Sequence, residues 1–203
     1  MVDKLKKWVC VFCGSADGAR PEYAAAAQEL GRAIAKRGHG LVYGGAAVGL
    51  MGAMADAALG AGGEVVGAIP DAMMEREIGH RGLTELHVVR TMHERKALMA
   101  ERANAFVALP GGYGTMDEFL EIVTWAQLGI HAQPCVLVNT GGYYDGLLGF
   151  FDTAVAEGFI QPKSRGLVQV AQDAAEALEI VDREWSVREE IPRHDKRLDR
   201  VVM

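Results

Sequence analysis

The sequence predicts a Rossmann-like α/β fold, a doubly wound and mainly parallel sheet of about seven strands with helices on both faces. Short apolar segments rich in β-branched residues alternate along the chain with longer segments of helical period. Three of the connections that follow apolar segments consist of glycine and other small residues. No internal repeat or low-complexity linker interrupts the series. This alternation is typical of successive βα units around one sheet.

The predicted strands are short apolar runs, as expected for strands that are buried on both faces of a parallel sheet. They are expected at residues 8–13, 40–44, 64–69, 85–90, 104–109, 134–139 and 167–170.

Helices are expected between these strands, and the first shows the clearest amphipathic pattern. Tyr23, Ala27, Leu30 and Ile34 have the spacing of one buried stripe. The helices are expected to start near residues 20, 48, 91, 115, 143 and 172.

Ligands of open parallel sheets bind beyond the carboxyl ends of the strands, where the strand order reverses. The glycine-rich or small-residue loops that follow the first, second and fifth predicted strands are therefore the candidate binding loops. They cover residues 14–15, 44–52 and 110–115.

The composition indicates one globular domain with a substantial core. Half of the 203 residues are hydrophobic, and we expect this domain to span residues 1–185. Half of the residues from Ser186 onward are charged, so 186–203 is interpreted as a solvated tail or a segment that docks on a partner subunit.

The net charge of −6 offers no general attraction for nucleic acid or an anionic membrane, so a phosphate ligand requires a local pocket. No apolar run reaches the ~20 residues of a membrane span, and no signal pattern precedes the first strand.

Three cysteines do not suggest a disulfide framework, and together with the absence of a membrane span or signal pattern they predict a cytoplasmic protein. Cys10 and Cys13 form a C-x-x-C motif, but a strand there directs the two side chains to opposite faces, which disfavours a metal or redox role.

The common nucleotide motifs are absent. Neither glycine loop matches G-x-G-x-x-G, and no Gly-Lys dipeptide supplies the lysine of a P-loop. The histidines, His93 included, lack metal-ligand spacing such as H-E-x-x-H, so we predict no metal.

The turn from Pro110 to Thr115 follows an apolar strand and precedes a helix that is expected to start at about Thr115. Unpaired N–H groups at a helix start bind anions, and glycines let a phosphate approach the backbone. A tight turn that needs positive φ values explains the same residues equally well, and the turn alone leaves both interpretations open.

Thr115 and Glu118 fit a capping box, so Glu118 is either a helix cap or a functional carboxylate. Glu121 lies beside Glu118 on the same helix, and such a like-charge pair is unfavourable unless another group uses the charge. This favours a site, and a raised carboxyl pKa would suit acid or base chemistry there.

Thr91 and Glu94 fit a second capping box, at the start of another helix. On that helix Arg95 shares a face with Met92 and Met99. It is either a surface arginine whose stem covers apolar area or part of a site where two helix starts converge.

The segment 110–118, P-G-G-Y-G-T-M-D-E, resembles the P-G-G-x-G-T-x-x-E signature of the LOG family of cytokinin riboside 5'-monophosphate phosphoribohydrolases. The resemblance covers about residues 8–162. The family's Y-G-G-G turn is here Tyr43-Gly44-Gly45-Ala46, one methyl group larger. The other matching segments are 43–45, 49–52, 92–96 and 125–131.

The resemblance implies that Arg95 and Glu118 are the catalytic pair and that the turn 111–115 holds a 5'-phosphate. It implies hydrolysis of the N-glycosidic bond of AMP or an N6-prenylated AMP, no cofactor, and a homodimer with sites near the interface. A carboxylate suits this reaction because positive charge develops on the sugar. The expected substrate-binding residues are Ser15, Gly44, Gly45, Glu77, Met92, Lys96, Gly111, Gly112, Tyr113, Gly114, Thr115, Met116, Asp117, Glu121 and Thr124.

Two alternatives have other requirements. A non-catalytic carrier of a phosphorylated ligand, such as molybdenum cofactor, needs the turn but not Arg95 and Glu118. Decarboxylation with pyridoxal phosphate needs a lysine that forms a Schiff base, and Lys96 alone among the lysines is well placed for it.

Overall fold

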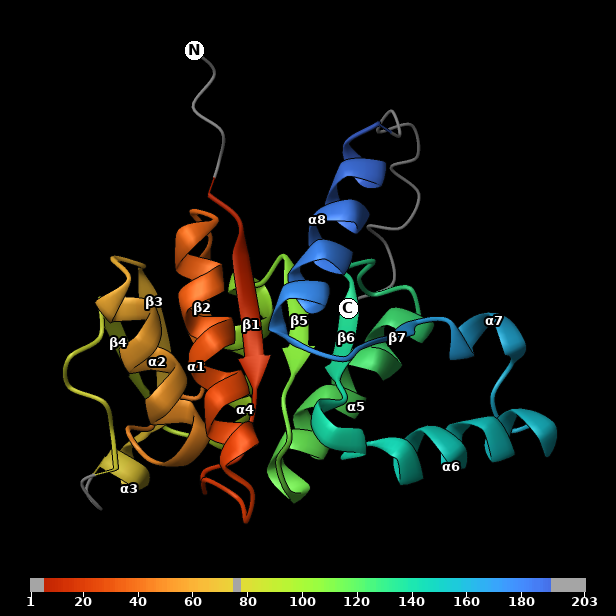
Figure 1. Cartoon of the computed structure of the whole chain (residues 1–203), viewed down its shortest axis with the longest axis horizontal. Coiled ribbons are helices and arrows are strands. Elements are labelled where there is room, and N and C mark those ends of the chain that lie inside the picture. The colour runs from red at the N-terminus through yellow and green to blue at the C-terminus, as the bar shows by residue number, and fades with distance from the viewer. Residues whose placement is uncertain (1–5, 75–77, 191–203) are drawn as a thin grey trace.

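The computed structural model describes residues 6–74 and 78–190, with side chains up to residue 187. Its seven strands form one sheet in the order β4-β3-β2-β1-β5-β6-β7, and all six neighbouring pairs are parallel (Figure 1). Each predicted strand is confirmed to within about two residues at its ends. The strands are β1 Trp8–Phe12, β2 Gly40–Tyr43, β3 Val65–Pro70, β4 Glu85–Val89, β5 Ala105–Ala108, β6 Cys135–Val138 and β7 Val168–Ala171.

The six predicted helices are present, and their starts lie within about two residues of the expected positions. Three short helices were not predicted, because segments of three or four residues have no periodic pattern. The helices are α1 Pro21–Lys36, α2 Gly49–Gly60, α3 Asp71–Met74, α4 Met92–Arg102, α5 Tyr113–Gln127, η1 Thr140–Gly142, α6 Asp145–Ala156, α7 Pro162–Arg165 and α8 Ala174–Glu190.

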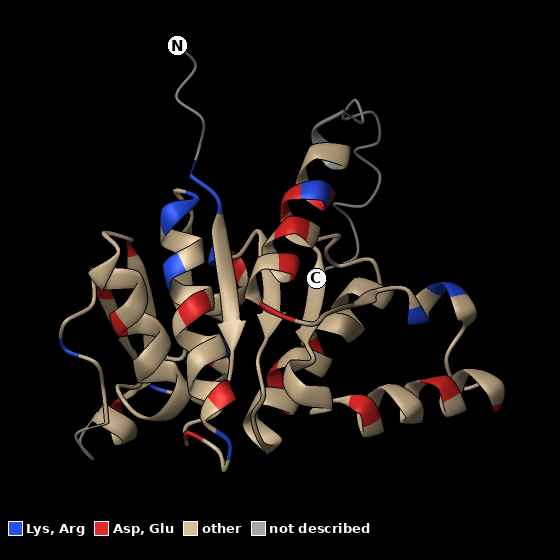
Figure 2. Ribbon diagram, in the orientation of Figure 1, with Lys and Arg blue, Asp and Glu red and all other residues tan. Residues whose placement is uncertain are grey.

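The helices cover both faces of the sheet and bury two apolar layers. On one face α1, α2 and α8 pack against side chains such as Val9, Leu41 and Val107. On the other face α4, α5 and α6 pack against side chains such as Cys10 and Phe106. Charged side chains lie on the helices and loops, whereas the central strands have none (Figure 2). This is the doubly wound arrangement that the sequence predicts.

Cys10 and Cys13 contribute to opposite core layers, as their odd spacing requires. Each is buried and carries a free thiol. Burial raises the pKa of both thiols, so they stay protonated apolar side chains.

The predicted domain boundary at Ser186 lies within a helix, because α8 continues to Glu190. Trp185 anchors this part of α8: its side chain is buried and its indole Nε1 donates a hydrogen bond to the Asn104 carbonyl at 2.7 Å. None of the described helices is long and apolar enough to cross a membrane.

Candidate active site

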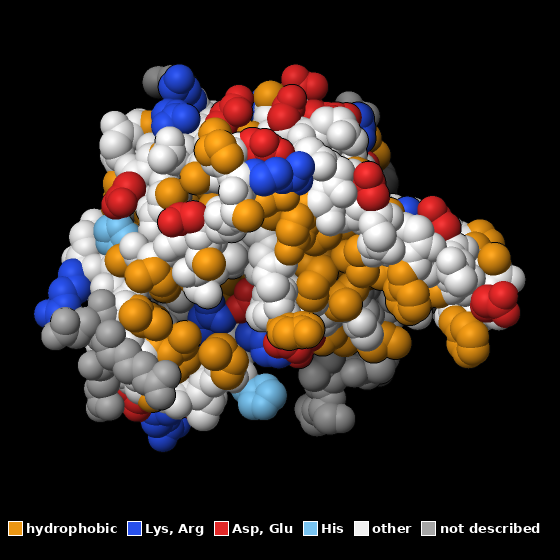
Figure 3. Space-filling view, turned by 60° about the horizontal axis from the view of Figure 1, so that its bottom comes forward, with side chains coloured by type: hydrophobic (Ala, Val, Ile, Leu, Met, Phe, Trp, Pro, Cys, Tyr) orange, Lys and Arg blue, Asp and Glu red, His pale blue; other side chains and the backbone are white. Residues whose placement is uncertain are grey.

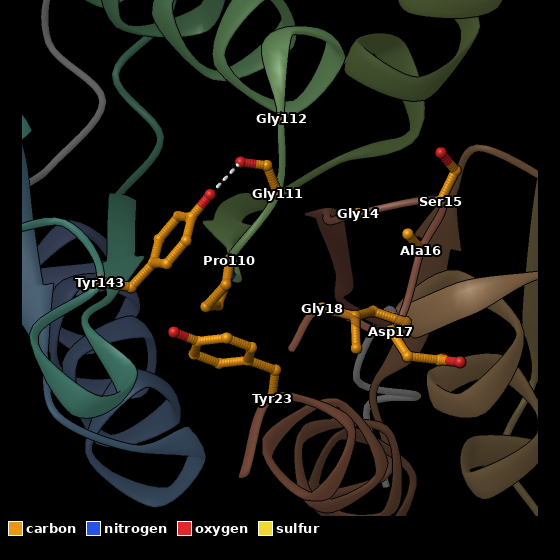
Figure 4. Close-up of a pocket in the computed structure, with 11 residues that line it drawn as sticks. Gly14, Ser15, Ala16, Asp17, Gly18, Tyr23, Pro110, Gly111, Gly112 and Tyr143 are labelled. Atoms are coloured by element: carbon orange, nitrogen blue, oxygen red, sulfur yellow. Dashed lines mark hydrogen bonds between the residues drawn. The ribbon is translucent and has the colours of Figure 1, made fainter. Parts of the chain in front are cut away.

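The strand order reverses at β1, which lies between β2 and β5. The loops that follow β1 and β5 therefore meet at one edge of the sheet, where Gly14 N–H donates to the Pro110 carbonyl at 3.1 Å. A pocket of about 300 Å³ lies between them (Figure 4). It is lined by Gly14, Ser15, Ala16, Asp17, Gly18, Tyr23, Leu50, Pro110, Gly111, Gly112 and Tyr143.

The turn after β5 lines this pocket with Pro110, Gly111 and Gly112, directly before α5. Helix α5 begins at Tyr113 with Gly112 as its N-cap residue. The first intrahelical bond donor is Met116, which bonds to the Gly112 carbonyl, so the N–H groups of Tyr113 to Thr115 have no acceptor within the helix. Gly111 is required sterically, because a Cβ there would overlap the Thr115 hydroxyl. The turn has the geometry of an anion site.

Of the two interpretations of Glu118, the capping box with Thr115 is not the one that the structure has. The helix starts two residues earlier, so both side chains lie inside it, and Gly112 has no side-chain cap within the part of the chain described. Thr115 and Glu118 are both buried. Glu118 is therefore free for another contact.

That contact is with Arg95, whose guanidinium donates from Nη1 to Glu118 Oε1. Each side chain is only 10 % exposed, and Arg95 Nε also donates to the Ala68 carbonyl at 3.0 Å. The expectation of a surface arginine is overturned, because Arg95 is held between β3 and α5 and faces a carboxylate. The two helix starts do converge, and the structure joins them through a buried ion pair.

Burial raises the pKa of Glu118 above the usual value of a glutamate, and the positive charge and hydrogen bond of Arg95 offset only part of that rise. A buried carboxylate whose pKa is raised toward neutral pH is typical of residues that act in acid–base catalysis or stabilise charge. The sequence predicted a raised carboxyl pKa from the pair of Glu118 and Glu121. The direction agrees, and burial is its largest cause.

The other two carboxylates on α5 have their own cation. Lys96 Nζ lies 3.2 Å from Asp117 Oδ2 and 3.1 Å from Glu121 Oε2. Burial alone would lower the pKa of Lys96, but its hydrogen bonds to Glu121 and Asp117 outweigh burial and raise it. The like-charge pair of Glu118 and Glu121 is thus compensated by two cations on α4. Arg95 contacts Glu118, and Lys96 contacts Glu121.

The start of α4 is capped as expected on one side only. Thr91 Oγ1 accepts from Glu94 N–H at 3.1 Å, whereas the Glu94 carboxylate accepts from Arg90 N–H at 2.8 Å and not from the cap residue itself. Met92, half-exposed, places its sulfur 3.5 Å from Arg95 Nη1.

Glycines of the loop after β2 accommodate the ion pair. A Cβ on Gly44 would overlap Nη2 of Arg95. Gly45 has a φ of +75° and packs against the Ala68 backbone. Ala46, where the LOG pattern has glycine, is buried and only 2 % exposed. Its extra volume is therefore accommodated in the interior and not in an open cleft.

The remaining predicted residues divide into three groups. Tyr113 and Gly114 are exposed in the first turn of α5, and Met116 packs partly against the core. Thr124 lies instead along a second cleft of about 270 Å³ between α5, α6 and α7, with its hydroxyl bonded to the Leu120 carbonyl. Glu77 lies outside the described residues.

The sequence did not indicate the two tyrosines that bond to the backbone beside the pocket, of which Tyr143 lines it. Tyr143 OH donates to the Gly111 carbonyl at 2.7 Å, and Tyr144 OH donates to the Leu109 carbonyl at 2.6 Å. The Asn139 side chain holds the Tyr144 backbone at the start of α6, since it accepts from Tyr144 N–H and donates to Asp145. The Tyr-Tyr pair after two glycines, at the carboxyl end of β6, was the available signal.

The pocket lies where the strand order of a parallel sheet reverses, next to a turn with the geometry of an anion site and a buried Arg–Glu pair. These features are typical of α/β proteins that bind nucleotides. The family model described as "Possible lysine decarboxylase" matches residues 51–181. The chain is 53 % identical over 173 residues to the cytokinin riboside 5'-monophosphate phosphoribohydrolase of Rhodococcoides fascians, covering 85 % of this chain and 87 % of that protein. It is 47 % identical over 195 residues to the cytokinin riboside 5'-monophosphate phosphoribohydrolase LOG1 of Arabidopsis thaliana, covering 96 % and 89 %. The chain belongs to this phosphoribohydrolase family.

Among solved structures, the chain is similar to the Moco carrier protein of Chlamydomonas reinhardtii. The TM-score is 0.68 at 27 % identity, with 90 % of this chain and 99 % of that chain covered. A protein named as a Moco carrier therefore has the same fold as this chain.

Proposed function

We propose that this protein hydrolyses the N-glycosidic bond of a nucleoside 5'-monophosphate, AMP or an N6-prenylated AMP, to the free base and ribose 5-phosphate. The buried pair of Arg95 and Glu118 beside the anion-binding turn is the observation that carries the proposal. Relatives of about 50 % identity that are named as phosphoribohydrolases support it over the carrier alternative, whose relative is 27 % identical.

The proposal assigns a role to each part of the site. The N–H groups at the start of α5, with Ser15 across the pocket, hold the 5'-phosphate. Glu118 as a carboxylate stabilises the positive charge that develops on the sugar or accepts a proton from the attacking water. Arg95 holds Glu118 in place through Nη1 and is itself held by the Ala68 carbonyl.

Schiff-base chemistry is disfavoured at Lys96. A Schiff base forms from a neutral amine, whereas the contacts with Asp117 and Glu121 raise the pKa of Lys96 and keep it protonated. The family model's description of a lysine decarboxylase thus gains no support from Lys96.

Purified protein incubated with AMP and with N6-prenylated AMP tests the proposal. We expect free base and ribose 5-phosphate in equal amounts. Tight binding of either nucleotide without any cleavage would favour the carrier alternative.

The protein is proposed to act as a homodimer in the cytoplasm. An apolar surface on α5, α6 and the segments that follow them supports the dimer. Its members include Phe150, 63 % exposed, and Phe159, 87 % exposed, and hydrophobic side chains gather around α6 in Figure 3. Leu120 lines the same cleft as Phe150, and Leu128 and Ile130 are exposed just beyond the end of α5.

Light scattering tests this interface. Phe150→Asp is expected to give a monomer, because a charge in a buried apolar interface is unfavourable. Val187→Asp on α8, also an exposed apolar position, is the control and should leave the mass unchanged. A monomeric wild-type protein would refute the dimer.

A further inference from the structure

Three successive carbonyl groups at the end of β5 and the start of the turn each accept a hydrogen bond from outside the turn. Leu109 accepts from Tyr144 OH, Pro110 from Gly14 N–H, and Gly111 from Tyr143 OH. Two of the three donors are neighbouring tyrosines from the segment between β6 and α6. The peptide planes of the turn are thus fixed by residues more than 30 positions away in the sequence.

The direction of a carbonyl fixes the direction of the following N–H, because the two lie on opposite sides of a planar trans peptide. The bond to Gly111 therefore turns the N–H of Gly112 away from Tyr143. Figure 4 shows Tyr143 on one side of Gly111 and the loop of Gly14 and Ser15 on the other. Gly111 and Gly112 are both pocket-lining residues, so this N–H lies at the site of the anion.

Glycines at 111 and 112 would let this peptide rotate if nothing held it. The rotated form would point a carbonyl oxygen at the phosphate in place of an N–H, which replaces an attraction with a repulsion. The Tyr143 ring is itself held edge-on against Tyr23 and Tyr144, with centroids 5.6 Å and 4.9 Å away. Its hydroxyl is thus a fixed donor and not a mobile one.

We propose that Tyr143 is a positioning residue for phosphate binding, because its hydroxyl keeps the Gly111–Gly112 peptide in the orientation that donates to the substrate's 5'-phosphate. The inference rests on the proposed function only for the identity of the ligand. Tyr143 touches the turn, and it acts on the phosphate through the peptide.

Tyr144 provides a matched control, because the residue after Leu109 is Pro110, which has no N–H. Fixing the Leu109 carbonyl therefore orients no donor. The Tyr144 hydroxyl bond is buried, whereas Tyr143 is 42 % exposed. Losing the Tyr144 hydroxyl should reduce stability, and losing the Tyr143 hydroxyl should reduce phosphate binding.

The test compares Tyr143→Phe and Tyr144→Phe by calorimetry with AMP, ribose 5-phosphate and adenosine. For Tyr143→Phe we expect the Kd of the two phosphorylated ligands to rise about five- to tenfold, the range of one lost hydrogen bond, with adenosine binding unchanged. KM for the nucleotide should rise by a similar factor while kcat changes little. For Tyr144→Phe we expect a lower Tm with unchanged Kd values.

Equal losses for phosphorylated ligands and adenosine, or unchanged Kd values for Tyr143→Phe, would overturn the proposal. Ribose 5-phosphate has no glycosidic bond to cleave, so its Kd tests the role of Tyr143 without turnover, and a protein that binds AMP without cleaving it would refute hydrolysis and leave this test intact.

Discussion

Replacement of Glu118 by glutamine tests the proposed chemistry most directly. Glutamine keeps the shape of the side chain and an oxygen that can accept from Arg95 Nη1, but it removes the charge. It leaves the turn at Gly112 to Thr115 unaltered. The change therefore separates charge stabilisation from phosphate binding.

The structural cost follows from the contacts of Arg95. Its guanidinium loses the opposite charge in a site where both side chains are 10 % exposed, yet it keeps the bond from Nε to the Ala68 carbonyl. Removing one partner of a buried pair costs about 3–5 kcal/mol when nothing replaces it, and a retained neutral acceptor reduces this to roughly 1–2 kcal/mol. A chain of this size should then lose about 2–8 °C in Tm and remain folded.

The catalytic cost should be larger. Removing one group that stabilises developing charge lowers kcat by about 10²- to 10³-fold. Release of free base is measured at saturating AMP, and the Kd of AMP is measured separately and should stay within about threefold. Glu101→Gln, exposed on α4, is the control for loss of a carboxylate. A kcat for Glu118→Gln within tenfold of the wild type would refute the role of this carboxylate.

Two further predictions concern the same pair. Gly44→Ala places a Cβ on Arg95 Nη2, so the guanidinium must move; we expect kcat to fall at least about tenfold, whereas Gly60→Ala, which meets open space, should change nothing. Undiminished turnover in the first variant would show that the position of Arg95 is not critical. The pH profile of kcat should lose activity on the acid side as Glu118 becomes protonated, with a midpoint above the ordinary glutamate value of ~4.3, because burial raises its pKa. A midpoint at or below that value would contradict an essential buried carboxylate.

The sequence predicted the sheet well because buried parallel strands are continuous apolar runs and the glycine loops mark their carboxyl ends. Spacing alone did not establish the partner of Glu118, and Arg95 was named with it only through the family resemblance. Thr115 and Glu118 have the spacing of a capping box, but spacing cannot locate a helix start within two residues when the preceding turn consists of glycines. Only the fold shows that α5 begins at Tyr113 and turns Glu118 inward.

Long-range contacts explain the other differences. Nothing near Arg95 in the sequence indicates that Glu118 lies opposite, so local pattern alone left a surface arginine open. The bond between Tyr143 and Gly111 joins residues 32 positions apart, and it exists because β6 lies beside β5. Site residues contributed by one βα unit were predictable, whereas contacts between units required the strand order.

The pairing of charges on α4 and α5 has a consequence for how fast substrate arrives. Arg95 and Lys96 face Glu118, Asp117 and Glu121, so the cations nearest the turn are already neutralised by carboxylates. Among the residues that line the pocket, the one charged side chain is that of Asp17. A chain with a net charge of −6 thus has no long-range field that draws a dianion toward this cleft. Encounter should therefore gain no rate from electrostatic steering, and selection for the phosphate takes place at contact distance, through backbone N–H groups that salt screens only weakly.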